Sequence, residues 1–394
     1  MLHDNYTQYN PFFKGVNTKY FKEDELTGGY KAFIEMPVKK HLCPHCGNIT
    51  NFIKDYRFQI VKDLTVFGKP LTVTVRKRRY ICKNCNSTFT EENPYIKRYC
   101  HFPNRLYLES IKETLSLQSF SSIANRLGVS VTSVIRWFDN LSCSHPQLPE
   151  CIAIDEFRGN AGCEKFQCNL ADPVKHKIID ILPSRNAEAL CKHFLEYPYK
   201  ERAEVKKITM DLSTLFRSVA KAVFPEAKIV ADKFHVIRVV INSLENVRKR
   251  VQKEFHATKR KWFKRSRYLL LRPEYKLTDE DKIELARMLN SSSELEKAYV
   301  LKERFYEVFR KNTRNEAKRE LGNWLLLASQ LSVPEFKHCI TTFTNWRTEI
   351  ANIIGESVSN GFIEGSNNKI KVLKRISYGV RNFERFRNRI LYLQ

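Results

Sequence analysis

The sequence predicts a multidomain α/β protein in which a cysteine-bearing β-hairpin and a helical segment precede a mixed sheet. Three observations predict this class. Two Cys-x-x-Cys pairs flank residues that alternate between apolar and polar. Apolar residues then recur with helical spacing from Asn104 to Leu141. After Cys151, short apolar runs alternate with helical patterns, and the strand signals stop after His235.

The charge of the chain favours a polyanionic partner. Lys and Arg number 68 against 43 Asp and Glu, a formal net charge of +25 over 394 residues. Nucleic acid is the commonest partner of so basic a protein, and a basic protein that binds no nucleic acid is the alternative. No apolar run of about 18 residues predicts a membrane span, and the first residues lack the pattern of a secretory signal. With no export signal, the 11 Cys indicate reduced thiols in the cytoplasm rather than disulfides.

Residues 1–40 alternate aromatic side chains with Lys and Asp. These rings can belong to a core, to a tail or to a surface that stacks on a partner: Tyr6, Tyr9, Phe12, Phe13, Tyr20 and Phe21.

Residues 41–100 predict a structural zinc module. The four thiolates that suit tetrahedral Zn²⁺ are those of Cys43, Cys46, Cys82 and Cys85. The 35 residues between the two pairs exceed the usual zinc-ribbon spacing, but they hold two strand-like runs, 56–61 and 71–76. A β-hairpin would therefore bring the pairs together. Unrelated reduced cysteines are the alternative, and His45 and His101 are weaker candidate ligands.

Residues 104–145 carry a helix-turn-helix pattern. Gly128 lies at the expected turn, and Ser130 can cap the second helix. The outward side of that helix would present Thr132, Ser133 and Arg136 to DNA. In a cationic chain the pattern favours DNA reading, with an ordinary helical hairpin as the alternative.

The central unit predicts three strands followed by alternating helices and strands. The expected strands are 152–155, 166–170, 176–182, 205–210 and 228–231, and the expected helices are 187–197, 212–223 and one after His235. The order βββαβαβα is that of a ribonuclease-H-like fold. In this fold Asp155 and Asp211 end neighbouring strands at one edge of the sheet, whereas Asp172 and Asp180 are expected at the surface of a hairpin.

A helical insertion at 241–354 is expected to divide this core into 150–240 and 355–394. Its Lys- and Arg-rich stretch, 248–267, predicts either a solvated helix face or a phosphate-contacting surface. In the last segment Glu364 lies near the start of a basic helix, where the helix dipole alone can also explain an acid. The candidate DNA-contacting cations of this helix are Lys369, Lys371, Lys374 and Arg375.

Three carboxylates thus fall at sites consistent with one fold: Asp155, Asp211 and Glu364. In a cationic protein, such a set can hold two Mg²⁺ ions against a phosphodiester.

Together the cysteine pairs, the helix-turn-helix pattern and three further segments resemble the ISL3 family of bacterial insertion-sequence transposases. These segments are Ile154-Asp155-Glu-Phe, Met210-Asp211 with Phe224-Pro-Glu-Ala-Lys-Ile-Val-Ala-Asp232-Lys-Phe-His235, and Asn360-Gly-Phe-Ile-Glu364-Gly-Ser-Asn-Asn-Lys-Ile-Lys. The resemblance implies a DDE catalytic triad of Asp155, Asp211 and Glu364. It gives Asp232 and His235 a supporting place beside that triad. Asp232 also follows a predicted strand and is the alternative second carboxylate; Asp211 is preferred because its strand neighbours the first.

The expected function is therefore a transposase that binds the terminal inverted repeats of its element and catalyses Mg²⁺- or Mn²⁺-dependent cleavage and strand transfer. The expected partners are double-stranded DNA, at element ends and target, and further copies of the chain, because two ends must be handled together. No membrane partner is expected, and the protein is expected in the bacterial cytoplasm with the nucleoid. The alternatives are a non-catalytic zinc-finger and helix-turn-helix regulator, or a nuclease without strand transfer.

Overall fold

The computed structural model describes Phe13 and residues 15–97, 99–141, 143, 146–159, 161–162, 164–356 and 361–393. Tyr6, Tyr9, Phe12 and Asn360 lie outside these ranges. The described chain divides into two compact units, one running to Cys143 and resuming at Val372, the other holding the residues between. Within the described residues, none of the helices has the length and apolar content needed to cross a membrane.

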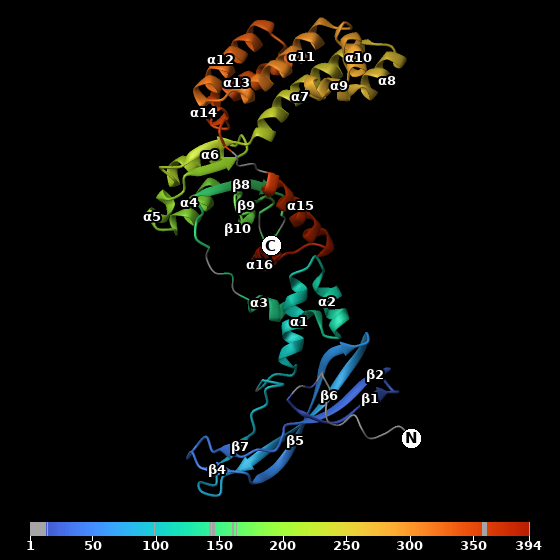
Figure 1. The fold of residues 1–394 in the computed structure, drawn as a ribbon, viewed down its shortest axis with the longest axis vertical. Coiled ribbons are helices and arrows are strands. Elements are labelled where there is room, and N and C mark those ends of the chain that lie inside the picture. The colour runs from blue at the N-terminus through green and yellow to red at the C-terminus, as the bar shows by residue number, and fades with distance from the viewer. Residues whose placement is uncertain are drawn as a thin grey trace. The chain divides into compact units, whose positions relative to one another are not determined.

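The first unit opens with a sheet of the order β1-β2-β6-β5, in which β7 also pairs with β6 (Figure 1). The strands of this region are β1 (Asn17–Asp24), β2 (Gly29–Glu35), β3 (His41–Leu42), β4 (Ile49–Thr50), β5 (Ile53–Val66), β6 (Lys69–Ile81) and β7 (Thr88–Thr90). Antiparallel pairing of β5 with β6 around the turn at Phe67 and Gly68 confirms the predicted hairpin. Gly68 takes a φ of 75°, which suits glycine at this tight connection.

One face of this sheet is buried. Side chains alternate across a strand, so the inward positions of β2, β5 and β6 form one apolar layer. This layer is covered by Phe13 and Ile96 and contains Ala32, Ile34, Val61, Val66, Leu71, Val73 and Val75. Of the aromatic residues predicted as core or stacking, Phe13 is buried, while Tyr20 is exposed on the other side.

Three short helices and a terminal helix complete the first unit: α1 (Asn104–Thr114), α2 (Phe120–Leu127), α3 (Val131–Asp139) and α16 (Phe383–Tyr392). Ser119 and Ser130 cap α2 and α3, and Gly128 ends α2 in the left-handed conformation with a φ of 66°. Arg389 of α16 is buried and donates to the backbone oxygens of Ser116, at 3.3 Å, and Gln118, at 2.6 Å.

The second unit contains a five-stranded sheet of the order β10-β9-β8-β11-β12. Its strands are β8 (Cys151–Phe157), β9 (Gln167–Asp172), β10 (Lys177–Leu182), β11 (Lys207–Met210) and β12 (Lys228–Ala231). The first three strands pair antiparallel, and β11 and β12 run parallel to β8. The helices that connect these strands are α4 (Ala187–Leu195), α5 (Tyr199–Ala203) and α6 (Thr214–Val223).

Two sequence expectations for this sheet were wrong. Asp155 lies inside β8 rather than at its end, because the strand continues to Phe157 in its pairing with β9. Asp172 and Asp180 are buried rather than at the surface, with exposed fractions of 6% and 2%. The Asp172 carboxylate accepts the backbone N–H groups of Val174 and Lys175, so it caps the β9–β10 turn from within.

The segment predicted as a helical insertion is a helical block in the structure, while its status as a separate domain stays a prediction. It consists of α7 (Lys233–Val251), α8 (Ala257–Arg265), α9 (Arg267–Leu271), α10 (Asp279–Leu289), α11 (Ser293–Tyr306), α12 (Arg314–Leu331), α13 (Lys337–Asn345) and α14 (Arg347–Ala351). One apolar core runs from the sheet through Val240 and Leu244 of α7 into these helices. In the basic stretch, Arg248 is buried and binds Glu245 and Gln252, so this cation is not part of a phosphate-contacting surface.

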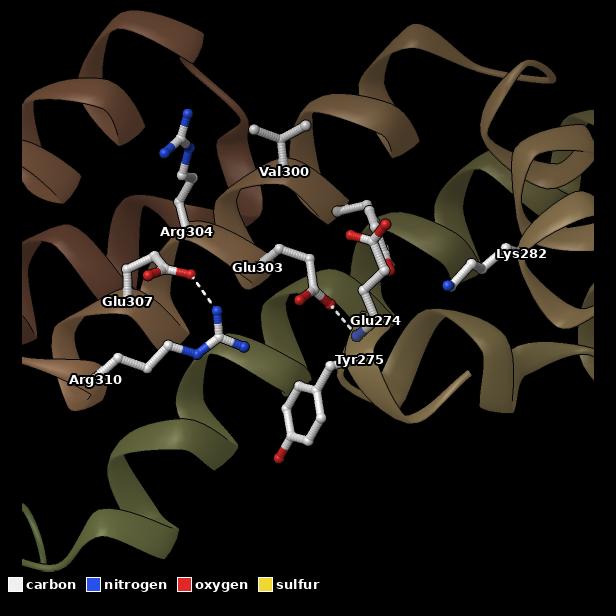
Figure 2. Close-up of a pocket in the computed structure, with 9 residues that line it drawn as sticks. Glu274, Tyr275, Lys282, Val300, Glu303, Arg304, Glu307 and Arg310 are labelled. Atoms are coloured by element: carbon white, nitrogen blue, oxygen red, sulfur yellow. Dashed lines mark hydrogen bonds and ion pairs between the residues drawn. The ribbon is translucent and has the colours of Figure 1, made fainter. Parts of the chain in front are cut away.

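A polar pocket lies among the helices of this block (Figure 2). Its charged side chains are engaged locally: Arg310 donates to Glu307 at 2.6 Å, and Glu303 accepts the Glu274 backbone N–H at 3.1 Å. None of the predicted catalytic carboxylates lines it.

Candidate catalytic and metal-binding sites

Three aspartates follow one another across the parallel part of the second sheet. Ile154 of β8 pairs with Met210 of β11, and Met210 pairs with Ala231 of β12. The residue after each of these three is an aspartate: Asp155 lies within β8, Asp211 directly follows β11 and Asp232 directly follows β12. Neighbouring strands lie about 4.8 Å apart, so the register itself brings these carboxyl groups to one edge.

Asp155 and Asp211 share an electrostatically unfavourable position. Burial raises the pKa of Asp155 to about 6, and the nearby charge of Asp211 adds to this rise. Burial also raises the pKa of Asp211, with a contribution from the charge of Glu156. Oδ1 of Asp211 is buried and has no hydrogen-bond partner among the described residues. A bound divalent cation would place a positive charge beside both carboxylates and so stabilise their ionised forms.

Asp232 is engaged differently. Its side chain accepts the Phe234 N–H at 3.2 Å, capping α7, and its second oxygen lies 2.7 Å from Nδ1 of His235. The Asp232 hydrogen bond raises the pKa of His235. Asp232 therefore has two hydrogen-bond partners, whereas Oδ1 of Asp211 has none among the described residues.

Helix α15 (Gly361–Ile376) is fixed to this edge by its first turns. Ile363 packs against Ala153 and Ala171 of the sheet. The Asn367 amide donates to Oδ2 of Asp155 at 2.7 Å, while Oδ1 of Asp155 accepts the Glu156 N–H at 2.8 Å.

A second amide supports the first. Asn169 of β9 is buried, and its Nδ2 donates to Oγ of Ser366 at 2.9 Å and to Oδ1 of Asn367 at 2.8 Å. Of the two adjacent amides of α15, only Asn367 reaches the site; Asn368 is exposed and accepts from Lys371 at 3.4 Å. Asn169 and Ser366 were not predicted. An amide within the buried strand Gln167–Asp172 was the available signal for Asn169.

Glu364 is exposed on the first turn of α15, one turn before Asn367. Residues three apart on a helix share a face, with about 5–6 Å between their Cβ atoms. Among the described residues, the carboxylates of Asp155, Asp211 and Glu364 do not all lie within 4.8 Å of one another, as the ligand atoms of the cysteine cluster do. In a site for two metal ions about 4 Å apart, the carboxylates that bind them lie farther from one another than the ligands of a single ion do.

Replacing Asn367 with alanine is expected to weaken metal-dependent activity by about 10- to 100-fold, because Asp155 loses the donor that orients it and Asn169 loses an acceptor. The measurement is cleavage rate against Mg²⁺ concentration, and the loss should appear as a higher Mg²⁺ requirement. The matched control is the exposed neighbour, Asn368→Ala, which should behave as wild type. Identical Mg²⁺ dependence of the two variants would contradict this role of Asn367.

The four cysteines predicted to bind zinc come together in the structure. The Sγ atoms of Cys43, Cys46, Cys82 and Cys85 all lie within 4.8 Å of one another. Cys43 is 3.6 Å from Cys85, and Cys46 is 3.6 Å from Cys82. Tetrahedral Zn²⁺ with Zn–S bonds of about 2.3 Å requires sulfurs about 3.8 Å apart, so the four side chains fit this ion.

Both cysteine pairs lie in equivalent backbone turns. The Cys43 carbonyl accepts the Gly47 N–H at 2.9 Å, and the Cys82 carbonyl accepts the Asn86 N–H at 2.8 Å. Gly47 and Asn86 take positive φ angles of 73° and 55°, a conformation that glycine and asparagine adopt most readily. The sequence therefore encodes the two turns that present the thiolates.

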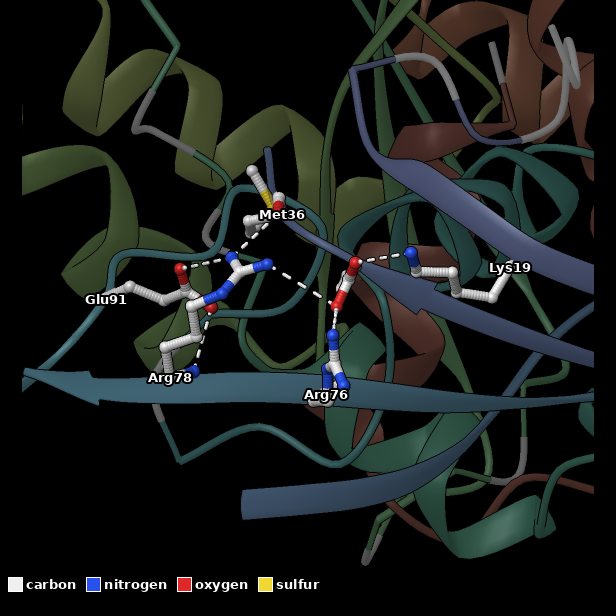
Figure 3. Close-up of polar contacts among 6 residues, drawn as sticks. Lys19, Met36, Arg76, Arg78 and Glu91 are labelled. Carbon is white, nitrogen blue, oxygen red and sulfur yellow. Dashed lines mark hydrogen bonds and ion pairs between the residues drawn. The ribbon is translucent and has the colours of Figure 1, made fainter. Parts of the chain in front are cut away.

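A buried ion network links β6 to Glu91, the residues on either side of the second cysteine turn (Figure 3). Glu91, just beyond β7, accepts the Arg78 N–H at 2.9 Å and its guanidinium at 3.2 Å. The same guanidinium donates to the Met36 carbonyl at 2.7 Å and lies 3.4 Å from Glu35. The side chains of Arg78 and Glu91 are only 2% and 1% exposed, so water stabilises neither charge and each is stabilised by the ion pair.

Replacing Arg78 with methionine is expected to destabilise the sheet by about 3–5 kcal/mol, because two buried carboxylates lose a cation. Hydrogen exchange of the β6 amides measures this locally. Arg79→Met, which removes an ion pair to the half-buried Asp55 and an exposed hydrogen bond to Thr88, should cost less than about 1 kcal/mol. Equal protection in both variants would refute the importance of the network.

The predicted DNA-contacting residues lie on two helices. On α3, Thr132 and Arg136 are exposed, whereas Ser133 is half-buried and shares a 2.8 Å hydrogen bond with Ser130. On α15, the exposed cations are Lys369, Lys371 and Arg375, while Lys374 is half-buried.

Comparison with known proteins agrees with these features. Residues 152–390 match the ISL3 family described as "Transposase", and residues 39–85 match the "zinc-finger of transposase IS204/IS1001/IS1096/IS1165". The chain is 25% identical over 363 residues to the transposase for insertion sequence element IS1001 of Bordetella parapertussis, covering 90% of this chain and 89% of that one. It is also 25% identical over 229 residues to the transposase for IS1557 of Mycobacterium tuberculosis, covering 52% and 51%. With a cysteine cluster in the matched zinc finger and more than half of the chain within the transposase match, this protein belongs to the ISL3 family of insertion-sequence transposases.

Proposed function

We propose that this transposase binds the terminal repeats of its element and catalyses Mg²⁺-dependent DNA cleavage and strand transfer through Asp155, Asp211 and Glu364. The observation that carries the proposal is the parallel pairing of β8 with β11, which sets Asp155 beside Asp211. The hydrogen bond from Asn367 to Asp155 then brings the Glu364 turn of α15 to the same edge.

The architecture supports this assignment. The order β10-β9-β8-β11-β12, with three antiparallel strands and then two parallel ones, is that expected of a ribonuclease-H-like core. In α1–α3, the serine caps and the left-handed Gly128 between α2 and α3 are consistent with a helix-turn-helix. Exposed Thr132 and Arg136 suit its contact with DNA.

Each side chain of the proposed site has a distinct task. Asp155, Asp211 and Glu364 would hold two Mg²⁺ ions. When bound, such a pair activates a water or a 3′-hydroxyl as nucleophile and stabilises the leaving oxygen. Asn367 keeps Asp155 oriented, and the Asp232–His235 pair places a polar, proton-bearing group beside Asp211. The chain's main contribution is the positioning of these groups and of the DNA backbone.

The test is cleavage of labelled terminal-repeat DNA by the full chain with and without Mg²⁺. Single substitutions of Asp155, Asp211 and Glu364 by alanine should each abolish cleavage and retain DNA binding. Retained cleavage in any of them removes that residue from the site. DNA binding by the wild type without metal-dependent cleavage would favour a regulator instead, and cleavage without capture of a 3′-hydroxyl end would favour a nuclease.

The same proposal implies which molecules this transposase binds. Double-stranded DNA at element ends and target is the substrate, and two or more copies of the chain would hold two ends together. The cationic side chains of α15 and α3 would contact phosphates, so binding should weaken steeply with salt. Zinc would have a structural role in the amino-terminal module.

A further inference from the structure

The outer face of the amino-terminal sheet bears an aromatic surface that the proposed chemistry does not use. Side chains of β5 alternate, so the face opposite Val61 carries Tyr56, Phe58 and Ile60. These three residues are 46%, 62% and 70% exposed. Cross-strand pairing continues the face through β6 and β2 to β1, where Tyr20 is 42% exposed. We call Tyr20, Phe33, Tyr56, Phe58 and Ile60 the open sheet face.

The rings of the open sheet face lie within contact of one another. The ring centroids of Tyr20 and Phe33 are 5.7 Å apart, and those of Phe33 and Phe58 are 6.2 Å apart. The Arg76 guanidinium lies 4.7 Å from the centroid of Tyr56 and 6.0 Å from that of Phe33. The face therefore presents several aromatic rings and a guanidinium group close together on one side of a paired sheet.

The charge around these rings is positive. Lys22 is exposed and lies 5.5 Å from the Tyr20 centroid. Two acids lie beside these cations, Asp24 and Glu35. Both are buried in ion pairs, Asp24 with Lys31 and Glu35 with Lys19 and Arg76.

This pattern of charge selects among partners. A second copy docking face to face would bring two positive surfaces together, which costs energy. A polyanion with exposed rings is complementary instead. Unpaired bases stack on aromatic side chains, while the phosphates between them are attracted to Lys and Arg.

We infer that the open sheet face binds single-stranded DNA by stacking its bases on Phe58, Tyr56 and Phe33. This site goes beyond the proposed cleavage chemistry and shares no residue with it. Its ligand is a strand whose bases are unpaired, as at a frayed or cleaved end. Duplex DNA, whose bases are already stacked, would gain nothing from these rings.

The test measures binding of a fluorescein-labelled oligothymidine of about 15 nucleotides to the full chain in Mg²⁺-free buffer, by polarisation. Phe58→Ala and Tyr56→Ala should each raise the Kd by about fivefold or more, and Phe58→Trp should restore binding. The matched control is Phe67→Ala, since Phe67 is 86% exposed at the β5–β6 turn, outside the open sheet face. Zinc content and hydrogen exchange should match wild type in every variant.

Unchanged Kd values in both alanine variants would overturn the inference. So would an equal loss of duplex binding, or conversion of a dimer to a monomer with oligothymidine affinity intact. Asp155→Ala should bind the oligonucleotide as wild type does. Failure of the catalytic proposal and failure of this one are therefore separate results.

Discussion

Replacing Asp211 with asparagine is expected to reduce Mg²⁺-dependent cleavage by about a thousandfold or more, a loss of roughly 4 kcal/mol of transition-state stabilisation. The reason is the buried Oδ1 of Asp211, which lies near Asp155 and has no hydrogen-bond partner within the described part of the chain. An amide keeps the shape of the side chain but removes the charge that a metal ion requires. Single-turnover cleavage of terminal-repeat DNA measures the effect, and filter binding verifies that DNA is still held.

Asp232→Asn is the matched comparison for this variant. Asp232 caps α7 and pairs with His235. Asparagine can still cap the helix but removes the negative charge beside His235, so a smaller loss of cleavage activity, about 10- to 100-fold, is expected. The reverse ranking, with Asp232→Asn inactive and Asp211→Asn active, would exchange the roles of the two residues.

Replacing Cys82 with serine is expected to abolish zinc binding and to disorder the turns around the two cysteine pairs. Zinc in small structural sites contributes about 10–16 kcal/mol of apparent binding free energy, which here would organise short strands with little core of their own. Elemental analysis should find one zinc per wild-type chain and close to none in Cys82→Ser. Hydrogen exchange at β3, β4 and β7 should rise in parallel.

Cys100→Ser provides the control, because Cys100 is exposed and outside the cysteine cluster. It should retain full zinc content and protection. Full zinc occupancy in Cys82→Ser would show that Cys82 is not a ligand.

The parts of this structure that depend on local pattern could be predicted from the sequence. The runs ending at Met210 and Ala231 are short, apolar and followed by aspartate, and they form β11 and β12 at the expected places. The strand-like alternation between the cysteine pairs predicted the hairpin, because period-two patterning is a local signal.

The parts that depend on tertiary contact could not. Asn367 and Asn169 are 198 positions apart, and only the folded sheet brings the two amides to Asp155. Aspartate is a residue type typical of the surface, but the side chains of Asp172 and Asp180 are buried and bind backbone N–H groups of the hairpin. Arg78 has the sequence pattern of an outward-facing cation in a basic strand, yet Glu91 and Met36 enclose it.

The most direct test of the metal-binding claim is crystallographic. Crystals of the full chain with terminal-repeat DNA and Mn²⁺ should give two anomalous peaks about 4 Å apart, with Asp155 and Asp211 as ligands and Glu364 drawn in from α15. Finding no manganese at Asp155 and Asp211, with Glu364 still directed into solvent, would contradict the proposed catalytic site.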